Sequence, residues 1–299
     1  MKVTSVGVKK IFKIKNKMFS YKKLEVVNNL NYEFKQGEII AIMGASNSGK
    51  STIVNLLSGR IRPSEGKIYV DDEFNYKKLK ENSVIITDLH NKKLLNNESV
   101  YNNLVYFGNK CKIDALDIEK KIVELRDVLE LEKVINKKVN ELNELEEVKL
   151  NVAISLLKNP LVVYFDNALV NFDSVTKNMI LKLLKRVNKE MKTTIVIASV
   201  DLMDIEKICK RVSVVQSGEI VIDDDFESVK KKYWNEKNVS ITFNKSFNIP
   251  KGDFQIMENS DYFLKIKIDF DKFDFASLIN QFDINTIIDI NIASVNVYK

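Results

Sequence analysis

The chain has 299 residues, of which 45% are hydrophobic and 29% charged, with a net charge of +6. This length suits a large α/β domain plus a small appendage, and the residue mix is typical of soluble globular proteins. No segment approaches the run of about 20 apolar residues that spans a bilayer, and the first residues lack the apolar core of a signal peptide. We therefore expect a cytoplasmic protein, in which a transport role would depend on a separate membrane protein. Two cysteines, Cys111 and Cys209, are too few for a disulfide framework.

The first part of the chain alternates between strand patterns and helix patterns. Residues 26–34 and 39–43 are predicted strands, and an apolar helix pattern follows Thr52. Further strands are expected at 67–70, 161–165 and 194–198, with a largely helical stretch over 94–157 and a helix around 179–187. Within the helical stretch, one face carries Ile122, Leu125, Val128 and Leu129. Strands that alternate with helices predict a parallel sheet with helical crossovers.

The pattern changes after residue 232. Residues 239–243 and 263–268 alternate with period two, as half-buried strands do. A helix is expected near 275–282 and a last strand near 292–297. We therefore predict a large domain over 1–232 and a small α+β, β-rich accessory domain over 233–299.

A phosphate-binding loop follows the strand at 39–43. Its motif is complete and consists of Gly44, Ala45, Ser46, Asn47, Ser48, Gly49, Lys50 and Ser51, followed by Thr52 at the start of a helix. The glycines let the backbone curl so that successive N–H groups point at phosphate oxygens, and the helix adds its positive end. In such a loop Lys50 contacts the β- and γ-phosphates, and the Ser51 hydroxyl is a ligand of Mg²⁺.

A second ligand for the metal is expected at the end of a neighbouring strand. Asp166 directly follows the apolar run 161–165 and could instead cap the strand end. Next to this phosphate loop, the better interpretation is a carboxylate that holds Mg²⁺ through water. Lys50 and Asp166 are thus the candidate catalytic residues, and Ser51 and Asp166 the candidate metal ligands.

These motifs, with a helical stretch between them, resemble an ATP-binding-cassette (ABC) ATPase. Residues 58–68 resemble the turn GxxxPxxGxI of that family, residues 171–173 its D-loop, and residues 201–212 its DLxxxExxCDRV helix. The similarity covers about 3–232, and the tail resembles bacterial export-type cassettes with a short β extension. The resemblance implies a doubly wound P-loop NTPase fold with a helical subdomain at about 90–158. It also implies that Tyr21 stacks on adenine, although Tyr21 could equally be an ordinary strand residue.

Several residues that drive hydrolysis in this family are missing. No glycine lies between Gly108 and Gly218, so the signature loop LSGGQ has no counterpart, and its place at 142–146 has the sequence LNELE. Asn167 stands where the family has its general base, and an amide cannot accept a proton. Val200 stands at the switch histidine. The glutamine of the Q-loop is also absent, and its place falls on His90 or on Asp88.

The resemblance therefore predicts a cytoplasmic subunit, peripheral on the inner face of the cell membrane, that binds Mg-ATP and hydrolyses it slowly or not at all. Its implied partners are an integral membrane transporter subunit, in an exporter, and a second cassette in a head-to-tail heterodimer. An active ATPase with unconventional residues and a soluble ABC-type regulatory protein remain alternatives. We expect no nucleic-acid partner, because such ABC proteins usually carry two cassettes or long coiled coils. A GTPase is disfavoured because the sequence lacks an N-K-x-D motif.

Overall fold

The computed structural model describes residues 1–15, 21–89, 93–199, 206–233, 236–270 and 273–294. The chain divides into two compact units, Met1–Asp223 and Asp224–Lys299. The division falls slightly before the boundary expected after residue 232, so that helix α7 (Phe226–Tyr233) belongs to the second unit.

A six-stranded sheet forms the centre of the first unit. Its strand order is β5-β6-β7-β3-β8-β9. The pairs from β5 to β8 are all parallel, which confirms the predicted parallel sheet. The strands are β3 (Ile39–Met43), β5 (Ser83–Ile86), β6 (Val162–Asp166), β7 (Thr194–Ser199), β8 (Arg211–Gln216) and β9 (Glu219–Asp225). Because the chain enters each parallel strand from the same side, the loops after β3 and β6 meet at one edge of the sheet.

A smaller antiparallel sheet in the order β2-β1-β4 packs against helix α1 (Lys50–Leu57). Its strands are β1 (Lys2–Lys15), β2 (Tyr21–Lys35) and β4 (Glu65–Val70). The two sheets share one apolar core, which contains Phe34, Ile53 and Tyr164. The buried Tyr164 hydroxyl donates to the Leu57 carbonyl at 2.9 Å, so the last turn of α1 is fixed to β6.

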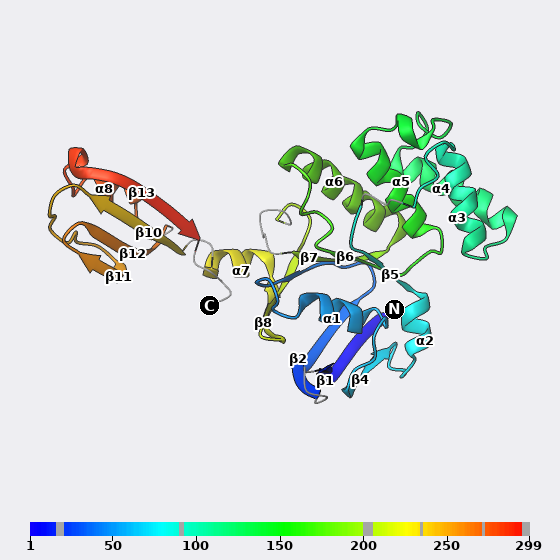
Figure 1. The fold of residues 1–299 in the computed structure, drawn as a ribbon, viewed down its shortest axis with the longest axis horizontal. Helices are drawn as coiled ribbons and strands as arrows, with labels where there is room; N and C mark the ends of the chain where they lie inside the picture. The colour runs from blue at the N-terminus through cyan, green and yellow to red at the C-terminus, as the bar shows by residue number, and fades with distance from the viewer. Residues whose placement is uncertain (16–20, 90–92, 200–205, 234–235, 271–272, 295–299) are drawn as a thin grey trace. The chain divides into compact units, whose positions relative to one another are not determined.

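Helices surround the central sheet, as Figure 1 shows, with α6 and α1 on opposite faces. The helices of this unit are α2 (Tyr76–Glu81), α3 (Val100–Lys110), α4 (Ala115–Leu129), α5 (Glu144–Leu156) and α6 (Ser174–Met191), with a 3₁₀ turn at Val139–Glu141. The apolar face predicted for α4 is buried, as expected. Helices α3 and α4 approach closely, because a Cβ on Gly108 would lie 2.8 Å from the Ile118 side chain.

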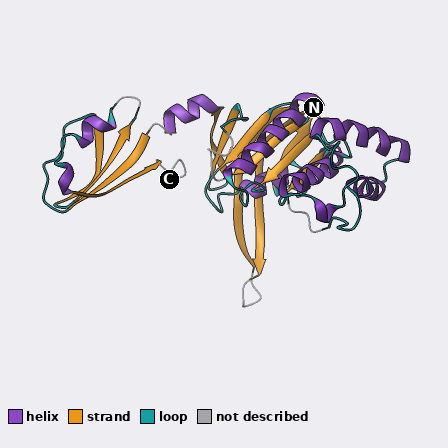
Figure 2. Cartoon of the chain, turned by 90° about the horizontal axis from the view of Figure 1, so that it is seen from above, coloured by secondary structure: helices purple, strands orange, loops and turns teal. Residues whose placement is uncertain are grey.

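The second unit is a four-stranded antiparallel sheet in the order β11-β12-β10-β13, and Figure 2 shows its strands side by side. Its elements are β10 (Glu236–Phe243), β11 (Phe254–Ser260), β12 (Phe263–Asp269), α8 (Phe275–Ile279), a 3₁₀ turn (Ile284–Thr286) and β13 (Ile287–Ser294). Leu278 of α8 packs on alternate residues of β10 and β12, such as Ile241 and Leu264. The strands predicted at 239–243 and 263–268 are confirmed, whereas the last strand begins earlier than predicted.

Candidate functional site

The loop between β3 and α1 is curled as its motif predicts. Asn47 and Gly49 have φ angles of 65° and 106°, in the left-handed region. A side chain on Gly49 would be strained by that angle, and its Cβ would also lie 2.9 Å from the Val26 carbonyl oxygen. A Cβ on Gly44 would lie 2.4 Å from the Ser48 hydroxyl. Both glycines are therefore required by the shape of the loop.

A neighbouring turn holds this loop in place. The N–H of Gly218 donates to the Ser48 carbonyl at 2.8 Å, and the Gly218 carbonyl accepts from Asn28 N–H at 3.1 Å. A Cβ on Gly218 would lie 2.2 Å from the Val26 carbonyl oxygen. In the sequence, Gly218 lies in residues 217–220, which resemble the xGxI motif of the ABC family, and its close approach to the loop is visible only in the structure.

Lys50 is nearly fully buried, with 4% of its surface exposed. Its ammonium group donates to the carbonyls of Gly44 and Ala45 at 2.7 and 2.8 Å. Burial lowers the pKa of Lys50, and the nearby Asp166 carboxylate partly opposes this effect. The cation is thus held inside the loop, next to the first N–H groups of α1.

Ser51 and Asp166 are brought together across the sheet edge. The Ser51 hydroxyl donates to Oδ1 of Asp166 at 2.9 Å, and the Asn167 amide donates to the same oxygen at 3.4 Å. A hydroxyl beside a carboxylate is the oxygen donor set that Mg²⁺ prefers. The Ser48 hydroxyl is buried and has no hydrogen-bond partner among the residues that the structure describes, so it is available to a phosphate or its water. These residues fit a magnesium nucleotide.

A groove of about 820 Å³ extends from this loop. Residues 46–52 form one wall, and the others come from β2 and from the segment after β6: Leu24, Val26, Asn167, Val170 and Asn171. A volume of this size falls in the range of about 300–1,000 Å³ that is usual for small-molecule sites.

Tyr21 does not line this groove. Leu24 and Val26 do, and because successive side chains of a strand alternate between faces, Tyr21 lies on the opposite face from Leu24. Phe12 of β1 pairs directly with Leu24, which places it on the groove side of the sheet. Phe12 is not among the lining residues of the groove, but the pairing of β1 with β2 makes it the aromatic residue of these strands that is nearest to Leu24 in register.

The segment 142–146, at the place of the family's signature loop, begins helix α5. Asn143 caps the helix by accepting from the Glu146 N–H at 2.9 Å, and the Glu146 carboxylate accepts from the Asn143 N–H at 2.9 Å. Glu146 also forms an ion pair with Lys137 at 3.3 Å. The first turn carries Glu144, Glu146 and Glu147, so this helix start is both capped by Asn143 and negatively charged.

The remaining predicted site residues differ in where they lie. Asn167 is exposed, has a φ of 54° and lines the groove. Asp173 of the predicted D-loop caps α6 by accepting from Val175 and Thr176 N–H. Val200 and His90 lie outside the described residues, while Asp88 is exposed after β5. The described part of the chain contains no group of three or more histidine, cysteine, aspartate or glutamate side chains that could hold a metal ion.

Comparison with known proteins agrees with this geometry. Residues 27–170 match the family model "ABC transporter". A methionine import ATP-binding protein MetN of Francisella tularensis is 34% identical over 200 residues, covering 65% of this chain and 57% of that protein. MetN of Clostridioides difficile is 29% identical, covering 80% of this chain and 76% of that protein. This chain thus spans less than two-thirds of the length of the Francisella relative.

Solved structures show the same fold. The first is cbiO1 of Clostridium perfringens, described as part of the ABC transporter complex cbiONQ, with a TM-score of 0.66, 24% identity and coverage of 76% of this chain and 89% of that one. The ATP-binding cassette MJ0796, as a dimer bound to ADP and Pi, gives a TM-score of 0.59 at 25% identity, covering 75% of this chain and 98% of that one.

The first unit therefore has the P-loop NTPase fold of an ABC ATPase. Residues 27–170 of this unit thus resemble the ABC transporter family, whose ATP-binding proteins bind ATP and Mg²⁺. The MetN relatives are named for import, which does not favour the exporter expected from the sequence. Among the described residues, no helix is both long and apolar enough to cross a membrane.

Proposed function

We propose that this chain is the ATP-binding subunit of an ABC importer, that it binds Mg-ATP, and that it hydrolyses the nucleotide slowly. The observation that carries the proposal is the contact between Ser51 and Asp166 beside a complete phosphate loop, with Asn167 at the next position. The binding half of the site is intact, whereas the residue that should accept a proton from water is an amide.

Each binding residue has a distinct task. Backbone N–H groups of the loop and the start of α1 donate to phosphate oxygens, and Lys50 supplies a positive charge next to them. Ser51 and Asp166 would hold Mg²⁺, which neutralises phosphate charge when it is bound. Phe12, across from Leu24, offers a ring for stacking on the base. Its side chain is 38% exposed, so the ring is accessible.

Two features support slow hydrolysis. Asn167 cannot act as a general base, a loss that typically costs about 10²–10⁴-fold in rate. In an ABC dimer the signature loop of one cassette covers the nucleotide of the other, and here that position carries Glu144 and a self-capped helix. A carboxylate about 4 Å from a phosphate is repelled by roughly 4 kcal/mol per charge pair at an effective dielectric constant near 20.

The assembly follows from the family. We propose that the chain pairs head to tail with a second cassette, and that an ordinary cassette is the partner because a homodimer would contain two impaired sites. We further propose a membrane subunit, a position on the inner face of the cell membrane, and a substrate of the methionine type, since the MetN relatives are named for methionine import.

Binding is tested by titration calorimetry with Mg-ATP on the purified chain. We expect saturable binding by the wild type and its loss in Lys50→Ala. The matched control is Lys182→Ala, at an exposed position of α6, which should bind like the wild type. Equal affinities of the wild type and Lys50→Ala would refute the nucleotide site.

Turnover and partners need separate measurements. Single-turnover hydrolysis in a complex with the co-purified partner should leave ATP at this chain's loop and ADP at the partner's loop. ADP at both loops within the same time would show an active ATPase. If no membrane protein co-purifies from detergent-solubilised membranes, the transporter role would be replaced by a soluble regulatory role.

A further inference from the structure

A second recess lies on the first unit at the other edge of the central sheet, where β3 and β8 begin and α6 ends. It has a volume of about 470 Å³. Ile39 and Ile208 give it apolar walls, and four lysines surround it: Lys185, Lys189, Lys192 and Lys210. The phosphate loop follows the carboxyl end of β3, so the two sites occupy opposite ends of the same strand.

Among the described residues, no carboxylate pairs with the lysines of this recess. Glu38 is its one acidic lining residue among those described, and it already accepts from the Arg211 guanidinium at 3.2 Å and from the Lys35 N–H at 2.8 Å. Within the described part of the chain, none of the four lysine ammonium groups forms a hydrogen bond or ion pair. The recess therefore concentrates positive charge.

The arrangement on α6 adds repulsion. Lys185 and Lys189 are four residues apart on one side of the helix, and Lys192 follows as its C-cap residue. Like charges at such spacings destabilise a helix, although the helix dipole favours cations near a carboxyl end. The dipole does not account for Lys210, which comes from the segment before β8 and lines the same recess.

The recess also has a fixed shape. The Asn188 amide donates to the carbonyls of Gly37 and Thr193 at 2.9 and 2.8 Å, which ties the end of α6 to the turn before β3. Gly37 N–H in turn donates to the Thr194 hydroxyl at 2.9 Å. A rigid wall lowers the entropy lost when a ligand binds.

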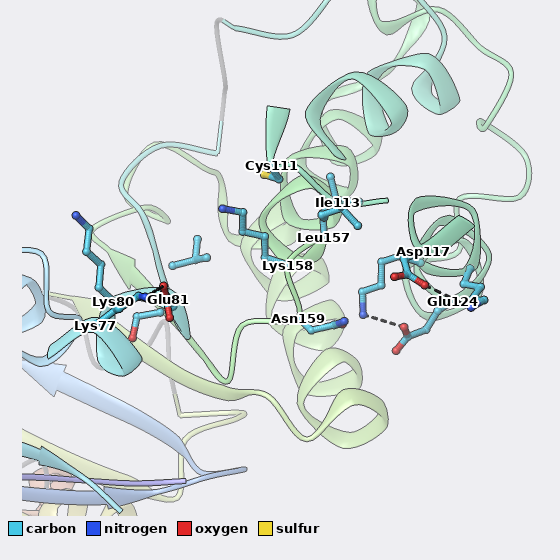
Figure 3. Close-up of a pocket in the computed structure, with 14 residues that line it drawn as sticks. Lys77, Lys80, Glu81, Cys111, Ile113, Asp117, Glu124, Leu157, Lys158 and Asn159 are labelled. Carbon is cyan, nitrogen blue, oxygen red and sulfur yellow. Dashed lines mark hydrogen bonds and ion pairs between the residues drawn. The ribbon is translucent and has the colours of Figure 1, made fainter. Parts of the chain in front are cut away.

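Another lysine-rich groove, of about 1040 Å³, shows the contrast (Figure 3). Five lysines line it, but three have their own carboxylates. These pairs are Lys77 with Glu81 at 3.9 Å, Lys120 with Asp117 at 3.3 Å, and Lys121 with Glu124 at 2.8 Å. Only Lys80 and Lys158 are left without a partner among the described residues. This groove is largely neutralised by the protein itself.

We propose that the smaller recess binds a soluble ligand that carries at least two phosphate groups. Lysine ammonium groups bind phosphate as compact point charges on flexible stems. Four of them around a concave site can contact separate phosphates, and the apolar walls accept an uncharged part of the ligand. The volume suits a small molecule rather than a nucleic-acid duplex. The site is independent of the nucleotide site.

Calorimetry with inorganic tripolyphosphate tests the proposal, using the full chain with Lys50→Ala so that the phosphate loop does not contribute. We expect saturable binding that Lys189→Ala/Lys210→Ala weakens by at least about tenfold. The matched control, Lys80→Ala/Lys158→Ala, removes the same charge from the groove of Figure 3 and should change the affinity less than about twofold. Absent binding, or equal weakening by both variants, would overturn the proposal.

Two further measurements distinguish a defined site from general charge attraction and a soluble ligand from a lipid headgroup. In lysine acetylation followed by mass spectrometry, tripolyphosphate should protect Lys185, Lys189 and Lys210 but leave Lys80 and Lys158 reactive. Uniform protection would indicate a general charge effect and would contradict a defined site. The second measurement is sedimentation with phosphatidylglycerol vesicles, which detects binding of the protein to a lipid headgroup. If the Lys189→Ala/Lys210→Ala variant loses vesicle binding while tripolyphosphate does not bind the parent, the ligand is a lipid headgroup and the soluble ligand is wrong.

Discussion

Helices α1 and α5 both begin beside a loop that the ABC family uses for phosphate, but their first N–H groups have different surroundings. Helix α1 has Gly49 as its cap, no side-chain cap and no acidic residue in its first turn. Helix α5 is capped by Asn143 and carries three glutamates in its first turn. Because every helix start has unpaired N–H groups, a phosphate binds where the chain leaves them free. The start of α1 is therefore open to an anion, whereas the start of α5 is capped by its own side chains.

The largest effect is expected from a substitution that distorts the phosphate loop before α1. Gly44→Ala places a Cβ 2.4 Å from the Ser48 hydroxyl and 2.5 Å from the Val215 carbonyl, so the loop must change shape. We expect Mg-ATP affinity, measured by calorimetry, to fall at least about 100-fold, since several charge-assisted hydrogen bonds are lost together. Gly37→Ala, where a φ of 85° strains a side chain although the added Cβ meets open space, is the control for a destabilising glycine substitution outside the loop and should retain binding. Unchanged affinity in Gly44→Ala would show that Mg-ATP binding does not depend on the loop that precedes α1.

A gain of activity is expected at the chemical step. Asn167→Glu restores a carboxylate next to Asp166, and steady-state turnover in the partner complex should rise by about 10- to 100-fold, below the full range of general-base effects. Asn167→Gln is the control, because it adds length without a base. Equal rates in both variants would show that Asn167 does not limit hydrolysis.

Stacking on the nucleotide base should have a smaller effect. Phe12→Ala is expected to weaken ATP binding about 5- to 20-fold, near the lower part of the range for base–aromatic stacking. Tyr21→Ala should leave affinity unchanged, because Tyr21 is on the opposite face of β2. If a fluorescence titration shows weaker ATP binding by Tyr21→Ala and unchanged binding by Phe12→Ala, the base contacts Tyr21 instead.

The smallest effect concerns the self-capped helix. Asn143→Ala removes the acceptor for Glu146 N–H, and the free energy of unfolding should fall by about 1 kcal/mol, the usual cost of losing an N-cap. Urea denaturation measures it, with Asn140→Ala as a nearby comparison outside the cap. If Asn143→Ala is as stable as the wild type, the capping box does not stabilise α5.

Sequence patterns predicted features within one short segment, but not the contacts between segments that are far apart in the chain. The phosphate loop, Asp166 and the buried face of α4 were predictable because each depends on a short motif or period. Which aromatic side chain lies on the same face as Leu24 was not predictable, because it follows from the pairing of β1 with β2. Strand β1 itself was not predicted, and neither the register of Gly218 against the loop nor the lysines around α6 follows from spacing alone.

The hydrogen bonds of the buried Lys50 ammonium group affect the free energy of nucleotide binding. In the free protein it already donates to the Gly44 and Ala45 carbonyls, at 2.7 and 2.8 Å. Nucleotide binding at this cation is therefore an exchange of partners, and only the difference between two sets of hydrogen bonds enters the free energy. The loop carbonyls and the phosphate therefore compete for the Lys50 ammonium group.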